Sequence, residues 1–265
     1  MICAKNSTGV LLLIGSGLFF GNAFLQGASP VPGWNTVPMR GMDQDVMLLP
    51  APSSTATAPS VLFLPGDAGW RGFAVEMASA MAASGYSVYG LDTKKYLSSF
   101  TDGKSTLTTG QISRDMHALI RWIVPGRGKL LVVGWSQGAA MAVLAAQGRG
   151  GHRRVSGVVA VSLPTEAALG WSRLDTMMSI FRKRPHQPHF ALSKHLGSVA
   201  PVGLYMIYAE KDDFTPPDQA QVLFRAAKEP KQYLGIPGAN HSFDQTRQAF
   251  WDALQRGLAW GRESN

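Results

Sequence analysis

Five consecutive residues, Gly134-Trp135-Ser136-Gln137-Gly138, match the pattern G-x-S-x-G. An apolar run, Leu130 to Val133, precedes them, and a helix-forming run, Ala139 to Ala146, follows. A serine at such a strand-to-helix turn has a strained backbone and an exposed hydroxyl, and the two glycines leave room for the turn. A chance match in a chain with 29 glycines is the alternative, but the flanking strand and helix argue against it. The pattern therefore indicates Ser136 as a nucleophile.

A base for this serine is expected in Gly238-Ala239-Asn240-His241-Ser242-Phe243, which follows the apolar segment Lys231 to Ile236. The His241 imidazole would accept the Ser136 proton while a carboxylate holds its tautomer. Ser242 and Gln245 form a capping-box pattern, which predicts that a helix begins there.

The acid is expected between these two motifs, because α/β-hydrolases present serine, acid and histidine in that chain order. The acid follows the next-to-last strand, here Gly203 to Tyr208, and the next residues contain two adjacent carboxylates, Asp212 and Asp213. Thr215 is a candidate helix N-cap with Pro216 at the first helical position. From the residues alone, either aspartate could serve.

An oxyanion hole requires two backbone N–H groups near the serine. One belongs to Gln137, at the start of the predicted helix. The other is expected from Asp67, in the segment Leu64 to Trp70, because these glycine-rich residues end an earlier apolar strand. A plain turn is the alternative for this segment.

Other polar residues have weaker support. The remaining histidines lack a comparable context, and His186-x-x-His189 has no acidic partner or third ligand, so we expect neither a metal nor another cofactor. Asp92 and Trp135 are candidates for contacting the substrate.

The elements that must position these residues alternate along the chain. Short apolar runs predict buried parallel strands at Val61 to Leu64, Ser87 to Leu91, Leu130 to Trp135, Val155 to Val161 and Gly203 to Tyr208. Segments with helical periodicity separate them, such as the stripe Ile112, Met116, Leu119, Ile120 and Ile123. Earlier edge strands are expected at Asp45 to Leu49 and around Val37. We predict an α/β-hydrolase fold, a mostly parallel sheet flanked by helices, as one domain over residues 28–265.

Residues 163–200 interrupt this alternation, and we expect a helical cap there. The segment combines apolar side chains with the basic run Arg182-Lys183-Arg184. Docking of the cap on an anionic membrane surface is one hypothesis, with Trp171 or Phe181 reaching the acyl boundary. Packing of these apolar residues onto the sheet, with solvated cations, is the other.

The N-terminus and the composition bear on location. Lys5 is the one charged residue before an apolar run from Val10 to Phe20, and small residues follow, so we expect residues 1–27 to be a signal peptide or N-terminal anchor and the protein to be periplasmic or otherwise exported. The single cysteine, Cys3, lies inside this segment, which leaves no disulfide in the domain. The net charge of +8 suits anionic surfaces, but no nucleic-acid-binding motif is present.

Several motifs together resemble the VirJ/AcvB-type bacterial virulence proteins of the α/β-hydrolase superfamily. The resemblance covers roughly residues 60–260 and rests on Gly66-Asp67-Ala68-Gly69-Trp70, Gly90-Leu91-Asp92 to Tyr96, the Gly134 to Gly138 motif, the Asp212 loop and Pro237 to Phe243. The chain departs from the usual G-D-G-G-W at Ala68, and from G-Y-S-F-G-A at Trp135 and Gln137.

The resemblance implies a periplasmic enzyme with Ser136, Asp212 and His241 as its triad, so it favours Asp212 over Asp213. Some members hydrolyse aminoacyl esters of phosphatidylglycerol, which implies a lipid ester substrate here, with Asp67 and Asp92 as partners for its ammonium group. Loop-capping roles for both acids are the alternative.

The expected function is therefore an exported serine hydrolase that cleaves a carboxylic ester, small or lipid-linked, through an acyl-enzyme. Cleavage of peptides or simple lipid esters is an alternative within the same enzyme class. A non-catalytic module that binds an envelope or secretion partner is the alternative from another class, and the complete set of serine, acid and histidine argues against it.

Overall fold

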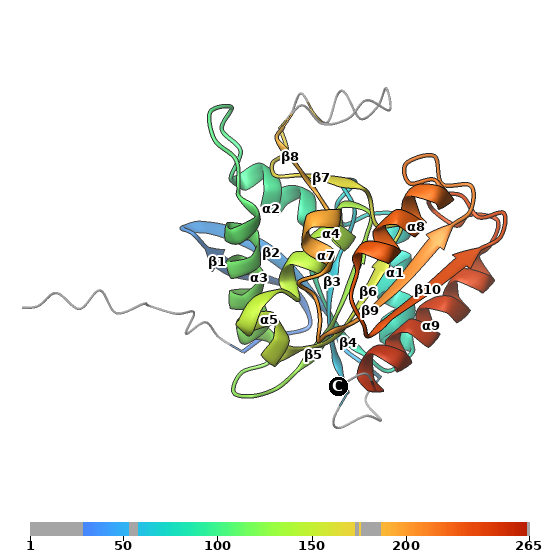
Figure 1. The fold of residues 1–265 in the computed structure, drawn as a ribbon. Coiled ribbons are helices and arrows are strands. Elements are labelled where there is room, and N and C mark those ends of the chain that lie inside the picture. The colour runs from blue at the N-terminus through green and yellow to red at the C-terminus, as the bar shows by residue number, and fades with distance from the viewer. Residues whose placement is uncertain (1–28, 53–57, 173–174, 176–186, 264–265) are drawn as a thin grey trace, which may run out of the picture.

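The structure is a computed structural model that describes residues 29–52, 58–172, 175 and 187–263 (Figure 1). The expected signal segment, the basic run Arg182 to Arg184 and Phe181 lie outside the described residues. Among the described residues, no helix is long and apolar enough to span a bilayer.

A sheet of eight strands forms the centre of the molecule, in the order β1-β2-β4-β3-β5-β6-β9-β10. The strands from β4 to β10 in this order pair in parallel, and β1 and β2 form an antiparallel hairpin at one edge. Their bounds are β1 Gly33–Met39, β2 Met42–Leu49, β3 Ser60–Leu64, β4 Ser87–Leu91, β5 Leu130–Trp135, β6 Val155–Val161, β9 Gly203–Ala209 and β10 Lys231–Ile236.

Helices cover both faces of this sheet, because side chains along each strand alternate between two apolar clusters. Leu62 of β3 and Val132 of β5 face one cluster, whereas Phe63 and Val133 face the other. The first cluster packs against α2 Thr93–Ser99, α3 Thr109–Ile123, α4 Gln137–Ala145, α7 Ser193–Leu196 and α8 Pro217–Ala226. The second packs against α1 Phe73–Ala83 and α9 Arg247–Glu263. A short helix, α5 Gly148–Arg154, leads into β6.

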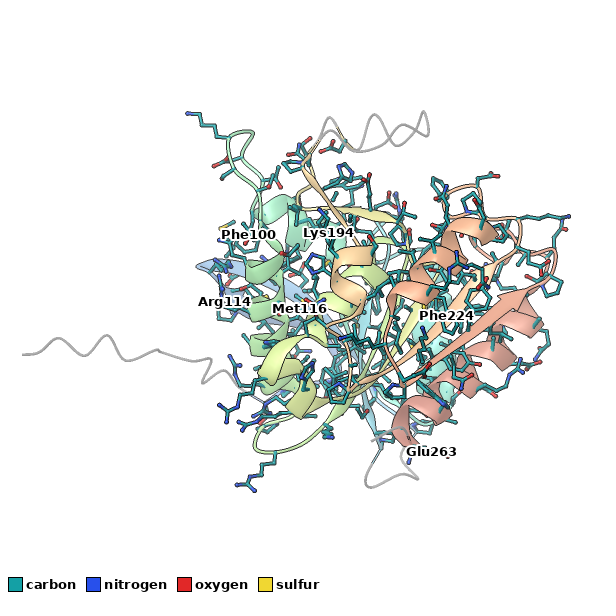
Figure 2. All side chains as sticks on the ribbon, viewed as in Figure 1. Phe100, Arg114, Met116, Lys194, Phe224 and Glu263 are labelled. Atoms are coloured by element: carbon teal, nitrogen blue, oxygen red, sulfur yellow. The ribbon has the colours of Figure 1, made fainter. Side chains whose placement is uncertain are left out.

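The helical stripe predicted for residues 112–123 is confirmed in α3. Met116 is fully buried and points toward the sheet, while Arg114 of the same helix is exposed and points outward (Figure 2). The predicted strands are also confirmed, including the two early edge strands. The mostly parallel sheet flanked by helices is the expected fold class.

Two predicted helix starts were wrong. The last helix begins at Arg247 rather than near Ser242, because Asn240 and Asp244 exchange two hydrogen bonds, from Asn240 Nδ2 at 2.9 Å and from the Asp244 N–H at 3.0 Å, which hold residues 240–244 in a turn. Helix α8 begins at Pro217, with Pro216 as its N-cap and the Thr215 hydroxyl buried outside the cap position.

The segment 163–200 contains, in its described part, a two-stranded antiparallel hairpin of β7 Glu166–Ala168 and β8 His189–Ala191, followed by α7. Figure 1 shows this hairpin above the end of the sheet where β5, β6 and β9 finish. The cap expected over residues 163–200 stays a prediction, because residues 173–174 and 176–186 of this segment lie outside the described residues.

Candidate active site

Ser136 occupies a sharp turn between β5 and α4, with φ 54° and ψ −122°. A non-glycine residue seldom adopts such angles unless the surroundings impose them. The surroundings do so through backbone contacts, because a Cβ atom at Gly134 would overlap Gly138 and one at Gly138 would overlap the Leu64 carbonyl group. The Ser136 N–H also donates to the Val161 carbonyl at 2.9 Å. The two glycines are thus required for helix, turn and β3 to meet.

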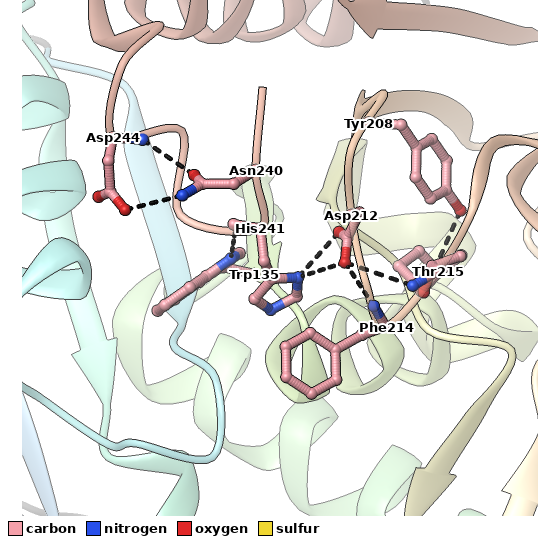
Figure 3. Close-up of polar contacts among 9 residues, drawn as sticks. Trp135, Tyr208, Asp212, Phe214, Thr215, Asn240, His241 and Asp244 are labelled. Atoms are coloured by element: carbon pink, nitrogen blue, oxygen red, sulfur yellow. Dashed lines mark hydrogen bonds and ion pairs between the residues drawn. The ribbon is translucent and has the colours of Figure 1, made fainter. Parts of the chain in front are cut away.

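His241 and Asp212 form a hydrogen-bonded pair at the same end of the sheet (Figure 3). His241 Nδ1 lies 2.8 Å from Asp212 Oδ2 and 3.0 Å from Oδ1. Asp212 is 3% exposed, whereas Asp213 is exposed to solvent. The structure therefore directs Asp212, and not its neighbour, toward the histidine.

Backbone donors turn the Asp212 carboxylate inward. Its Oδ1 accepts the N–H groups of Phe214 at 2.9 Å and Thr215 at 3.3 Å (Figure 3). Burial tends to raise the pKa of Asp212, but the His241 hydrogen bond and charge, with the Phe214 N–H and the Ser162 hydroxyl, outweigh it and lower the pKa below its ordinary value. The carboxylate is thus ionised when it meets the imidazole.

Two aromatic side chains flank the His241 ring. The Phe214 ring centroid lies 4.7 Å from it and that of Trp135 lies 5.6 Å away. Trp135 is buried, and its indole N–H donates to the His241 carbonyl at 3.3 Å. Phe214 is 59% exposed, so one face of the histidine borders an apolar surface that is open to solvent.

Ser136 and the His241–Asp212 pair lie at the same end of the sheet, because the carboxyl ends of parallel strands point the same way. Ser136 follows β5, Asp212 follows β9, and β6 alone separates these two strands. The Trp135 bond to His241 then links the turn at Ser136 directly to the histidine loop. All three predicted residues are brought to one end of the molecule.

The segment predicted to supply an oxyanion donor also lies at this turn. A Cβ atom at Gly66 would lie 3.4 Å from the Ser136 Cβ, so the residue before Asp67 abuts the serine. Gln137 is the first residue of α4, where N–H groups have no partner within the helix. The positive end of the helix dipole adds to the attraction for an anion here.

Trp70 packs against the sheet and supports the loop that carries Asp67. Its ring occupies the space that a side chain at position 90 would need, since a Cβ at Gly90 would overlap it. Trp70 also packs edge-on against Phe63 and against Trp34 of β1. The edge hairpin therefore buttresses the loop that carries Asp67.

Asp92, a predicted substrate contact, is the N-cap of α2 and accepts the Lys95 N–H at 3.0 Å. Its carboxylate lies against Gly69, at the back of the same loop. Asp67 is half-buried. Trp171, considered above as a membrane contact, is buried, which contradicts the idea that it reaches a bilayer.

Three of the other histidines contact the protein away from this site. His117 Nε2 lies 3.0 Å from the Ala145 carbonyl and His152 Nε2 lies 3.1 Å from that of Ser198, while His195 packs against Phe190. Within the described part of the chain, no group of three or more histidine, cysteine, aspartate or glutamate residues is arranged to hold a metal ion.

Two further features were not predicted. The side chain of Gln137 is 8% exposed and forms two hydrogen bonds with the backbone of Ala168 in β7. A groove of about 410 Å³ lies between the β7–β8 hairpin and α8, lined by Thr165, Glu166, Ala191, Ser193, Gln219, Val222 and Leu223. Neither had a signal in the sequence, since each depends on residues distant along the chain.

Fold and connectivity define this protein as an α/β-hydrolase-fold protein. Solved structures with this fold match nearly the whole described chain. Est1E from Butyrivibrio proteoclasticus aligns with a TM-score of 0.64 at 12% identity, covering 86% of this chain and 98% of that one. XC6422 from Xanthomonas campestris, described as an α/β serine hydrolase without lid, aligns with a TM-score of 0.58 at 16% identity, covering 87% and 95%.

The sequence identifies the family. Residues 59–258 match the model of the bacterial virulence protein VirJ, so the chain belongs to the VirJ family. The uncharacterized protein Rv2307c of Mycobacterium tuberculosis is 29% identical over 254 residues, which cover 89% of this chain and 85% of that protein.

Proposed function

We propose that this protein is a serine hydrolase that cleaves carboxylic esters through an acyl-enzyme. The observation that carries the proposal is the hydrogen bond between His241 Nδ1 and the buried Asp212 carboxylate. It lies at the carboxyl end of the parallel strands, where the strained turn presents Ser136. A carboxylate on Nδ1 leaves Nε2 as the nitrogen that accepts a proton. This arrangement suits activation of a serine hydroxyl.

In the proposed reaction, His241 Nε2 takes the hydroxyl proton as Ser136 Oγ attacks the ester carbonyl carbon. The N–H groups of Gln137 and Asp67 donate to the oxyanion that forms. Collapse of this intermediate breaks the bond to the alcohol, which leaves with the proton from His241. Water then attacks the acyl-enzyme by the same route and releases the acid.

For the substrate class, we propose an ester with an apolar portion beside the reacting carbonyl. Exposed Phe214 against His241 offers an apolar contact there, and the groove along α8 offers space for a larger group. The family resemblance favours a lipid-linked aminoacyl ester, such as one on phosphatidylglycerol, at the periplasmic face of a membrane. Asp67 is the carboxylate proposed to meet its ammonium group, whereas Asp92 is engaged as the N-cap of α2.

Reaction with a fluorophosphonate probe tests the proposal. The intact protein should form one covalent adduct, on Ser136, and should hydrolyse p-nitrophenyl esters. Ser136→Ala should abolish both while leaving the unfolding temperature near that of the parent, because this side chain contributes little packing. Ser84→Ala is the matched control, since Ser84 is exposed at the end of α1, where its hydroxyl donates only to the Ala80 carbonyl at 2.8 Å.

Two outcomes would remove the enzymatic role. Absence of labelling and of hydrolysis in the folded parent would favour a non-catalytic module that binds an envelope partner. Labelling that persists in Ser136→Ala would place the nucleophile elsewhere.

A further inference from the structure

Strand β7 has an outer edge that faces the nucleophile turn. In the β7–β8 hairpin, the Leu169 N–H donates to the Pro188 carbonyl at 2.8 Å, and the Leu192 N–H donates to the Thr165 carbonyl at 2.9 Å. Hydrogen-bonded pairs alternate along an antiparallel ladder, so the N–H and C=O of Ala168 point away from β8. Ala168 is 1% exposed, and both groups need partners inside the protein.

The side chain of Gln137 supplies both partners. Its Nε2 donates to the Ala168 carbonyl at 2.9 Å, and its Oε1 accepts the Ala168 N–H at 3.0 Å. A primary amide presents a donor and an acceptor side by side, as the N–H and C=O of a single strand residue do. The glutamine thus takes the place of a neighbouring strand along β7.

This pairing constrains the residue after Ser136 from two sides. The backbone of Gln137 begins α4, and its side chain is held by the hairpin. The hairpin segment is itself fixed on its far side, where the Leu107 N–H donates to the Leu169 carbonyl at 3.1 Å and the Trp171 N–H donates to Thr101 Oγ1 at 3.0 Å. Any rotation of the first turn of α4 therefore breaks a buried pair of hydrogen bonds.

We propose that the Gln137 side chain is a positioning residue, which aims its own backbone N–H at the oxyanion by locking the start of α4 to the β7–β8 hairpin. The inference rests on the ester hydrolysis proposed above. Oxyanion stabilisation depends on donors placed to within a fraction of an ångström, so loss of the lock should lower turnover more than substrate binding.

The test compares Gln137→Leu with the intact protein, using p-nitrophenyl butyrate and titration of active sites with a p-nitrophenyl phosphonate. Leucine has a similar size but cannot bond to Ala168. We expect kcat per titrated site to fall roughly ten- to hundredfold while KM changes little. Gln147→Leu is the matched control, because Gln147 bonds a backbone carbonyl, that of His195, at the other end of α4, and its kcat per site should stay within about twofold.

A second variant covers the case in which leucine prevents folding. In Gln137→Glu, a protonated carboxyl group can donate to the Ala168 carbonyl and accept its N–H, whereas the carboxylate can only accept. The ratio of kcat in this variant to kcat in the parent should therefore rise as pH falls. A purely structural role would change the number of titratable sites and leave kcat per site constant.

Unchanged kcat per site in Gln137→Leu would overturn the inference while ester hydrolysis stands, and so would a ratio for Gln137→Glu that does not vary with pH. A parent protein that neither reacts with the phosphonate nor hydrolyses the ester would overturn the proposed function, and this inference with it.

Discussion

The indole N–H of Trp135 donates a hydrogen bond to the backbone carbonyl of His241, at 3.3 Å and across 106 positions of sequence. Trp135 immediately precedes Ser136, so this bond connects the nucleophile turn with the loop that carries the histidine (Figure 3). The Trp135 and Phe73 rings also pack edge-on, with centroids 5.1 Å apart, and this contact helps to hold the indole in place.

Trp135→Phe should therefore retain a ring in the same space but release the His241 loop. We expect kcat for an ester to fall about fivefold, because a hydrogen bond of this kind contributes about 1 kcal/mol. Steady-state kinetics on p-nitrophenyl butyrate would show it. An unchanged kcat would mean that the loop holds His241 without the indole.

Asp212→Asn should reduce kcat by about 10⁴, because an amide on Nδ1 favours the wrong tautomer of the histidine. Asp213→Asn should leave kcat within about threefold, since the Asp213 side chain is exposed and His241 is bonded to Asp212 instead. Both variants replace an aspartate by an asparagine, and they differ only in which of two adjacent positions is changed. The reverse ranking in a turnover assay would assign the acid role to Asp213.

Lowering the pH should reduce the free energy of unfolding, partly through Asp212. Its folded-state pKa lies below the ordinary value of 3.8, so the ionised form stabilises the fold above that value, and this contribution is lost as pH falls through the lowered pKa. The free energy of unfolding, measured with urea from about pH 5 to pH 3, should thus decline more steeply for the parent than for Asp212→Asn. Parallel curves would contradict this linkage.

Val222→Trp should narrow the groove along α8. Val222 is 51% exposed and lines the groove, so a larger side chain there should raise KM several-fold for long-chain esters and leave phenyl acetate unaffected. Val75→Trp is the control, because Val75 is exposed on α1, which packs against the other face of the sheet. Equal effects on short and long esters would exclude the groove from the substrate site.

Most strands of the sheet could be predicted from the sequence, because buried parallel strands are continuous apolar runs, as Val155 to Val161 illustrates. The order of Ser136, the aspartate pair and His241 along the chain indicated where each would lie, since strand ends converge at one edge. The family resemblance favoured Asp212 over Asp213, and the loop geometry gives the physical reason, because the N–H groups of Phe214 and Thr215 decide which carboxylate turns inward.

Other features had no local signal. The pairing of Gln137 with Ala168 joins two segments 31 residues apart, and nothing in either segment indicates its partner. The capping pattern at Ser242 was misleading for a physical reason: Phe243 adopts a positive φ of 58° and is fully buried, which is incompatible with a helix passing through it. Tertiary burial overrode a local preference there.

The close backbone contacts at Gly134 and Gly138 have a practical consequence for altering selectivity. Substitutions at these positions move main chain against main chain, so a randomised library that includes them would consist largely of misfolded members. Phe214 and Val222 differ, because their side chains are more than half exposed and border open space. Libraries that vary Phe214 and Val222 and keep Gly134 and Gly138 would explore new ester preferences while retaining the turn on which the proposed chemistry depends.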